Sequence, residues 1–254
     1  MNAPAVIRQM ARPLLPRRAR PRRIATGPLR GFWMVASWHD YPAGLLGYTE
    51  GPLLRWLSET VRAGETWLDV GAHYGYTALA LARLVGPSGR VFAFEPVPAT
   101  GRCLSQTRLL NKMEQLRVIS VGLADSAHVT AVEVRLVRGM AEPEAATGEA
   151  AGTVPMVSLD RIWHRLAHGD DRIHGVKMDV QGMELRALGG MQAILMAQHP
   201  QVALEFHTGV DRPALLSLLA DCGYQLPGRP LAPLRDEGVP RYLADRTYLF
   251  SHTA

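Results

Sequence analysis

A short glycine-containing segment, TWLDVGAHYG at residues 66–75, constrains this chain more than any other stretch. Its first half is an apolar run of strand-forming residues that ends at Val70. Gly71 and Gly75 follow directly, and apolar residues then recur at helical spacing over Ala78–Val85. This order predicts a strand, a tight turn and a helix, in which backbone N–H groups of the turn approach a ligand closely.

A second strand-like run, Val91–Phe94, ends in Glu95 and Pro96, about 20 residues after the glycine turn. An acidic side chain at the end of the second strand is placed to accept two hydrogen bonds from a ribose. The glycine pattern is Gly71-x-x-x-Gly75, whereas dinucleotide-binding turns read G-x-G-x-x-G. The sequence therefore favours S-adenosylmethionine (SAM) over NAD, because SAM has no pyrophosphate that the turn must bind.

Apolar runs alternate with glycine or proline turns along most of the chain, which predicts an α/β fold with a mostly parallel sheet. The last run, residues 246–251, is expected to form an antiparallel C-terminal edge strand. Residues 129–157 interrupt the alternation with strand-like runs and are expected to form a small β insertion. Residues 31–65 are rich in aromatic side chains, and we expect a cover and a helix preceding the main domain, residues 66–254.

The positive charge is concentrated at the N-terminus. Eight arginines and no acidic residue precede Asp40, so that the chain carries +5 overall while the rest of it carries −3. Residues 1–30 are expected to be a flexible basic arm, and a contact with an anionic partner such as lipid or a carrier protein is the alternative. The rest of the chain has no basic patch with interleaved aromatic residues of the kind that binds nucleic acid. No apolar run is long enough to span a membrane.

The two cysteines, Cys103 and Cys222, make no disulfide framework and occur in apolar helical patterns. Buried free thiols fit a reducing compartment, and a cytoplasmic location is expected. The length of 254 residues is sufficient for one α/β domain with a short appendage. No feature of the sequence predicts an oligomeric state.

Polar side chains follow two further predicted strands at the edge where the carboxyl ends of parallel strands meet. Lys177 and Asp179 lie at the end of one strand, and Glu205 and His207 lie at the end of the next. His207 suits a general base near neutral pH. Asp179 is expected to orient it, to bind a substrate hydroxyl, or to act as the base itself. Lys177 is expected either to pair with a carboxylate or to stabilise an alkoxide. Asp179, Glu205 and His207 are also ligand types for divalent cations, but their spacing does not require an ion and no metal is predicted.

Candidate cofactor contacts lie in three places: at the glycine turn, at the end of the second strand, and at the start of the helix predicted before the turn. They are Asp69, Gly71, Ala72, His73, Tyr74, Gly75, Thr77, Glu95, Pro96 and Glu50. Asp69 is expected either to fix the glycine turn or to receive the ammonium group of the cofactor. His73 and Tyr74 either line the cofactor pocket or are exposed turn residues. Glu184 lies in the first turn of a predicted helix, where the helix dipole is a sufficient explanation of its charge.

Five segments occur in an order and spacing that resembles a known family: LDVGAHYGYTALALA, FAFEPVP, VSLDRIW, VKMDVQGMELRALGGM and PQVALEFH. They resemble the FkbM family of SAM-dependent methyltransferases over about residues 47–224. The resemblance implies a class I, Rossmann-like fold that binds SAM and releases S-adenosylhomocysteine (SAH). It also implies methyl transfer, typically to a hydroxyl of a secondary metabolite, sugar or lipid. Gln181 departs from the family, which usually has glutamate there.

The function expected from these observations is O-methylation of a small molecule. N-methylation of a small molecule is one alternative, although the predicted strand at residues 176–180 lacks the asparagine-proline-proline-aromatic motif of enzymes that modify amino groups of nucleic acids. The other alternative is a SAM-binding module without catalysis, which acts through the arm. Asp179 and His207 argue against such a module, whereas Gln181 argues mildly for it.

Overall fold

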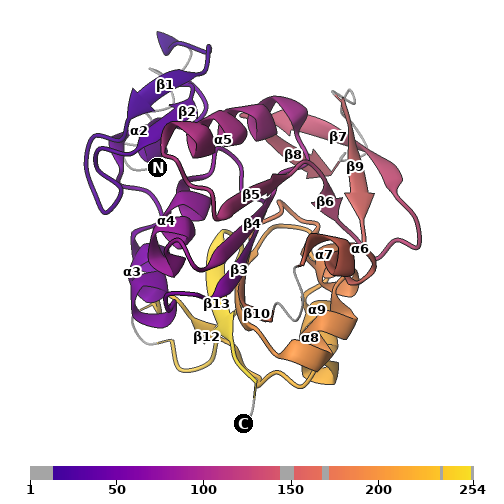
Figure 1. The fold of residues 1–254 in the computed structure, drawn as a ribbon. Coiled ribbons are helices and arrows are strands. Elements are labelled where there is room, and N and C mark those ends of the chain that lie inside the picture. The colour runs from indigo at the N-terminus through magenta and orange to yellow at the C-terminus, as the bar shows by residue number, and fades with distance from the viewer. Residues whose placement is uncertain (1–13, 144–151, 168–171, 235–236, 253–254) are drawn as a thin grey trace.

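The computed structural model describes residues 14–143, 152–167, 172–234 and 237–252. A seven-stranded sheet crosses the middle of the molecule in the order β12-β13-β11-β10-β3-β4-β5 (Figure 1). In that order the strands are Arg229–Pro230, Arg246–Phe250, Gln201–Phe206, Ile173–Met178, Thr66–Val70, Arg90–Phe94 and Leu116–Ile119. The five strands from β11 to β5 run parallel, which confirms the predicted mostly parallel sheet.

Helices cover both faces of this sheet (Figure 1). They are α3 (Gly51–Thr60), α4 (Tyr76–Val85), α5 (Pro98–Leu110), α6 (Leu159–Leu166), α7 (Glu184–Gly189), α8 (Gln192–Gln198) and α9 (Arg212–Asp221). The short helix α2 (Pro42–Leu46) packs with the N-terminal hairpin instead. The alternation of side chains along β3 explains the two layers. Trp67 packs on one face with α3 and α4, whereas Leu68 and Val70 pack on the other face with α6 to α9.

The C-terminal strand β13 runs antiparallel to β11, as predicted. It is not the edge of the sheet, however, because the two-residue strand β12 pairs outside it. Pro230 in β12 has no backbone N–H and is tolerated at an edge for that reason. The predicted antiparallel C-terminal strand is therefore confirmed, but it lies one place in from the edge.

The expected β insertion, residues 129–157, supplies three strands of a separate four-stranded sheet in the order β6-β9-β7-β8, and β6 precedes the expected bounds. Its strands are Gly122–Leu123 (β6), Thr130–Val137 (β7), Met140–Pro143 (β8) and Gly152–Val157 (β9). β7 and β8 are joined by Arg138 and Gly139, both with positive φ, at 53° and 78°. Such a two-residue turn matches the twist of a hairpin. The small sheet packs at the end of the main sheet where strands β4 and β5 terminate (Figure 1).

The N-terminal segment differs from the expected flexible arm over residues 1–30. Arg20–Arg23 (β1) pairs antiparallel with Trp33–Ala36 (β2), and Ile24 and Leu29 between them are 1% exposed. Strand pairing and burial of two apolar side chains therefore fix the second half of the predicted arm to the domain. Residues 1–13 lie outside the described part of the chain.

The described helices include none that is both long and apolar enough to cross a membrane. Cys103 lies half-buried in α5, Cys222 follows α9 and is buried, and both are free thiols.

Candidate active site

A cavity of about 290 Å³ opens at the carboxyl ends of β3, β4 and β10. The insertion forms an apolar wall that includes Leu123, Met140, Ala141, Val154 and Met156. Nine of the predicted site residues line the cavity: Glu50, Gly71, Ala72, His73, Thr77, Glu95, Pro96, Lys177 and Asp179. The cavity therefore has an apolar end beside the insertion and a polar end beside β10.

The glycine turn is shaped by a close approach of two backbone segments. Gly71 has φ of 81°, and a Cβ atom there would lie 1.8 Å from the carbonyl oxygen of Asp179. The N–H groups of Gly71 and Ala72 both donate to the carbonyl oxygen of Phe94, each at 3.0 Å. Gly75 precedes α4 with φ of 91° and packs on Leu104, outside the cavity lining. A side chain at position 71 would clash with the backbone of Asp179. Glycine there therefore allows the ends of β3, β4 and β10 to approach one another.

Glu95 ties the glycine turn to the segment after β4. Its Oε2 accepts a hydrogen bond from the backbone N–H of His73 and its Oε1 accepts one from Val97, both at 2.8 Å. Burial raises the pKa of Glu95 to about 7, because the two hydrogen bonds only partly offset desolvation. Each carboxylate oxygen still has a lone pair for a ligand hydroxyl group.

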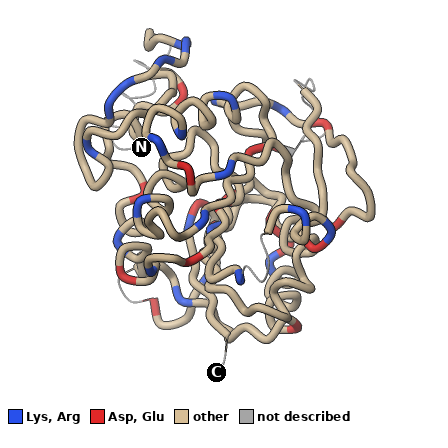
Figure 2. Tube along the Cα trace, in the orientation of Figure 1, with Lys and Arg blue, Asp and Glu red and all other residues tan. Residues whose placement is uncertain are grey.

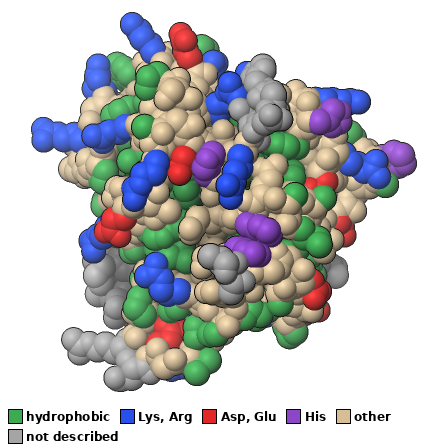
Figure 3. Space-filling model, turned by 60° about the horizontal axis from the view of Figure 1, so that its bottom comes forward, with side chains coloured by type: hydrophobic (Ala, Val, Ile, Leu, Met, Phe, Trp, Pro, Cys, Tyr) green, Lys and Arg blue, Asp and Glu red, His purple; other side chains and the backbone are tan. Residues whose placement is uncertain are grey.

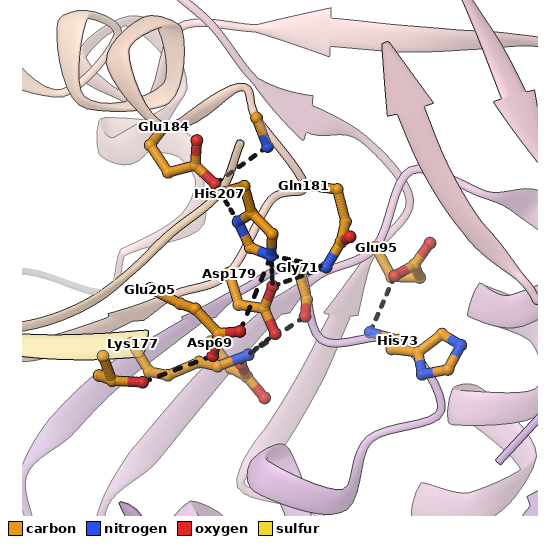
Figure 4. A network of polar contacts seen from close by, with 12 residues as sticks. Asp69, Gly71, His73, Glu95, Lys177, Asp179, Gln181, Glu184, Glu205 and His207 are labelled. Carbon is orange, nitrogen blue, oxygen red and sulfur yellow. Dashed lines mark hydrogen bonds and ion pairs between the residues drawn. The ribbon is translucent and has the colours of Figure 1, made fainter. Parts of the chain in front are cut away.

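Lys177 is the buried cation at the polar end of the cavity. Its Nζ lies 3.4 Å from Oδ1 of Asp69 and 3.6 Å from Oδ2 of Asp179, and it also donates to the carbonyl oxygen of Gly71 at 3.4 Å (Figure 4). Burial alone lowers the pKa of Lys177, but the charges of Asp69 and Asp179 outweigh burial and raise it. The expected carboxylate pairing of Lys177 is thus present.

Asp69 is fully buried and does not line the cavity. It lies opposite Lys177 in the register of β3 and β10, which places its carboxylate beneath the turn. Burial raises the pKa of Asp69, and the positive charge of Lys177 opposes this rise. Asp69 is linked to the glycine turn through Lys177, which lies 3.4 Å from its Oδ1 and donates to the carbonyl oxygen of Gly71. Which of its two expected roles Asp69 takes stays a prediction.

His207 follows β11 and is held from behind by a buried carboxylate. Its Nδ1 lies 2.6 Å from Oε1 of Glu184, and its Nε2 lies 3.4 Å from Oδ1 of Asp179 and 3.8 Å from Oε1 of Glu205 (Figure 4). Burial lowers the pKa of His207, but the hydrogen bond with Glu184 and the charge of Asp179 outweigh burial and raise it. Burial and the charge of Asp179 raise the pKa of Glu205 to about 7.

Gln181 completes this cluster in place of the glutamate that the resemblance leads one to expect. Its Nε2 lies 3.0 Å from Oδ1 of Asp179 and 3.0 Å from Nε2 of His207. Gln181 has a left-handed backbone, with φ of 53°, and Gly182 follows with φ of 98°. An amide N–H that donates to Nε2 of His207 leaves the ring proton on Nδ1, where Glu184 accepts it.

Asp179, Glu205 and His207 present ligand atoms within 4.8 Å of one another and form a set that could hold a divalent cation. The amide N–H of Gln181 points at two of these three atoms and satisfies them without an ion. The absence of a metal from the reaction stays a prediction.

Glu184 is the site residue that sequence reasoning missed. It is fully buried, and its Oε1 accepts from the backbone N–H of Gly182 at 3.0 Å as well as binding His207. The dipole of α7 explains an exposed acid at this place but not a buried one. A buried carboxylate requires a partner, and an apolar neighbourhood in the sequence around Glu184 was the signal that could have indicated this.

Two further groups close the cavity. Tyr41 of the aromatic cover lines it and packs edge-on against His73, with ring centroids 5.0 Å apart. The carbonyl oxygen of Arg138 lies 2.9 Å from Nε2 of His73, so the hairpin turn of the insertion sits on the glycine turn. Burial lowers the pKa of His73 to about 4. Tyr74 is not among the residues that line the cavity, but its hydroxyl donates at 3.0 Å to Asp40 of the cover, which does line it.

A mostly parallel seven-stranded sheet with an antiparallel C-terminal strand, and a strand-end cavity over a glycine turn, define a class I methyltransferase fold. Residues 69–226, more than half of the chain, match the family model described as the methyltransferase FkbM domain. The chain belongs to the FkbM methyltransferase family.

Solved structures share this fold. An FkbM methyltransferase from Methylobacillus flagellatus KT superposes with a TM-score of 0.52 at 20% identity, over 82% of this chain and 52% of that one. This chain therefore spans about half the length of that protein. An rRNA methylase from Streptococcus thermophilus superposes with a TM-score of 0.50 at 13% identity, over 81% of this chain and 99% of that one. A search of the curated proteins found no match.

Proposed function

We propose that this methyltransferase transfers the methyl group of SAM to a hydroxyl oxygen of a small molecule. When bound, SAM supplies a methyl group on a positively charged sulfur, and transfer to oxygen leaves SAH and one proton to be removed. The observation that carries the proposal is the pair of His207 and Glu184, with Nδ1 2.6 Å from a fully buried carboxylate. This pair is built to take a proton at Nε2, on the side of Asp179.

The charge and the lining of the cavity support the binding of SAM. Gly71 lets the backbone of Asp179 approach the glycine turn, which brings Asp179 to the cavity that the turn lines. Glu50, Glu95 and Asp179 line the cavity, and burial raises the pKa of both glutamates. A cationic sulfonium favours the charged forms of these carboxylates, so binding and ionisation support each other. Glu95 binds the ribose hydroxyls in this proposal, and the apolar wall of the insertion holds the adenine ring.

The protein's part in the transfer is to place the acceptor and to remove its proton. The acceptor hydroxyl takes the place of the Gln181 amide at Nε2 of His207 and donates its proton there. Glu184 then stabilises the charged imidazole across the 2.6 Å hydrogen bond. Lys177 holds Asp179 and the glycine turn in register, so that donor and acceptor sites keep a fixed separation.

The test separates cofactor binding from transfer. Calorimetric titration with SAM and with SAH is expected to show binding to the wild type and none to Glu95→Ala. Transfer of labelled methyl from SAM to a pool of hydroxylated metabolites is expected to fall by ~10² or more in His207→Ala, with SAM binding retained.

No binding of either SAM or SAH to the wild type would refute the proposal. Binding without transfer to any hydroxylated acceptor would favour the non-catalytic module. Label recovered on nitrogen would favour the N-methyltransferase alternative. Normal turnover by His207→Ala would show that the base has been wrongly assigned.

A further inference from the structure

The N-terminal hairpin carries a dense set of arginines on one edge of the molecule. Between Leu14 and Asp40 the chain has six arginines and no acidic residue: Arg17, Arg18, Arg20, Arg22, Arg23 and Arg30. Five of them are exposed, and Arg22 is half-buried. The tube view shows blue positions gathered on this hairpin, at the upper left, and the space-filling view shows Lys and Arg side chains projecting from that side of the molecule (Figures 2 and 3).

The hairpin is fixed to the domain and does not behave as a tethered tail. β1 pairs with β2 over four residues. The other edge of β2 is held by α5 and the residue after it, because Val35 donates to Thr107 Oγ1 and Trp33 donates to Asn111 Oδ1, both at 2.8 Å. The arginines of β1 are therefore presented from a rigid platform, which reduces the entropy lost when they bind a partner.

These arginines form no ion pair with a carboxylate in the described part of the chain. Among the ion pairs of residues 14–143, 152–167, 172–234 and 237–252, none joins one of the six to a carboxylate. Arg23 lies over the Trp33 ring at 4.5 Å and Arg22 lies over the Trp38 ring at 5.8 Å. These stacked guanidinium groups keep N–H donors free at their edges for an anion.

An apolar residue adjoins the charged set and favours one class of partner. Leu14 is 86% exposed, three residues before Arg17. An exposed leucine beside several arginines is suited to binding an anionic bilayer. The apolar side chain enters the headgroup region, and the arginines bind lipid phosphates. Single-stranded nucleic acid would instead need aromatic faces for its bases, and the rings of Trp33 and Trp38 are covered by arginines.

We propose that this arginine face, defined by Arg17, Arg18, Arg20, Arg22, Arg23 and Arg30 with Leu14 at its edge, binds the surface of an anionic phospholipid bilayer. The same chain segment continues from β2 to Asp40 and Tyr41, which line the cavity. A bilayer bound to the hairpin therefore contacts a segment that leads directly into the cavity. The proposal does not depend on the reaction catalysed there.

The experiment is co-sedimentation of the full-length protein with vesicles. Vesicles of phosphatidylglycerol and phosphatidylcholine are expected to carry the protein down at low salt, whereas pure phosphatidylcholine vesicles are not. The test variant replaces Arg17, Arg18 and Arg20 by glutamine. The control replaces three exposed arginines elsewhere, Arg55, Arg161 and Arg165, by glutamine and makes the same change in net charge.

We expect the test variant to bind anionic vesicles at least about tenfold more weakly than wild type and the control to bind within about twofold of it. Circular dichroism melting establishes that both variants are folded. No binding of wild type to anionic vesicles overturns the proposal, as does an equal loss in the two variants. Binding to a single-stranded or duplex oligonucleotide without binding to vesicles also overturns it and assigns the face to nucleic acid.

Discussion

Replacement of Glu184 by glutamine tests whether a buried carboxylate sets the basicity of His207. Oε1 of Glu184 already accepts from the backbone N–H of Gly182 at 3.0 Å and lies 2.6 Å from Nδ1 of His207. Two donors at one oxygen orient the new amide, so its carbonyl oxygen stays in place of Oε1 and its NH₂ group takes the place of Oε2. The variant therefore removes the negative charge and keeps the Nδ1–H tautomer of His207.

The expected effect is a lower pKa for His207. Loss of an opposite charge at hydrogen-bond distance changes a pKa by about 1 unit or more, which corresponds to about 1.4 kcal/mol. The charges of Asp179 and Glu205 remain and still raise the pKa of His207 in part. Because the imidazole must be neutral to accept a proton, the acid limb of the pH–activity profile should move to lower pH. Turnover at the plateau should fall by about tenfold, since the charged imidazole loses its partner.

The titration of the His207 ring can be followed by NMR of histidine-labelled protein and needs no acceptor substrate. A His207→Gln variant assigns its signal. Asp125→Asn is a matched control, because Asp125 is an exposed acid that pairs with Arg186 on α7 and is not one of the carboxylates paired with His207. A pKa of His207 that stays unchanged or rises in Glu184→Gln would refute the account of this pair. An equal shift in the control would show that the cause is the overall charge.

Further predictions concern the cofactor end, the cluster and the fold. Because ionised Glu95 accepts ribose hydroxyls and its pKa is about 7, SAM should bind more weakly at pH 6 than at pH 8, and calorimetry of Glu95→Gln should show no such dependence. Gln181→Glu adds a carboxylate beside His207, so NMR should show a higher pKa for the ring and Mn²⁺ titration should show a new binding site. Gly71→Ala places a Cβ 1.8 Å from a backbone oxygen and should lower the melting temperature sharply. Deletion of residues 1–30 removes two buried apolar side chains and should cost about 3–6 kcal/mol in urea unfolding, whereas an unchanged midpoint would show that β1 is not docked.

The sequence predicted most of the fold because the constraints were local. A strand, a glycine turn and a helix at residues 66–85 follow from the residues themselves, and the alternation that continues after them fixes a parallel sheet. The error over the N-terminal segment arose because its composition is typical of a disordered chain. Pairing of β1 with β2 depends on residues about a dozen positions away and on α5, so arginine content alone could not reveal it.

The sequence predicted which strand ends form the site but did not predict the hydrogen bonds within it. Strand ends brought Lys177, Asp179 and His207 together as the pattern indicated. The hydrogen bond that His207 donates to Glu184 depends on how α7 packs against the end of β11, which no spacing in the sequence encodes. The direction of Asp69 is likewise a matter of which face of β3 meets Lys177, since a residue at a strand end can point into a cavity or beneath it.

A crystal structure of the complex with SAH would locate the donor sulfur relative to the proposed base, His207. We expect the ribose hydroxyls on the Glu95 carboxylate, the adenine ring against the insertion, and the sulfur on the side of the glycine turn that faces Asp179 and His207. A ribose bound away from Glu95, or a sulfur separated from His207 by the glycine turn, would contradict this prediction.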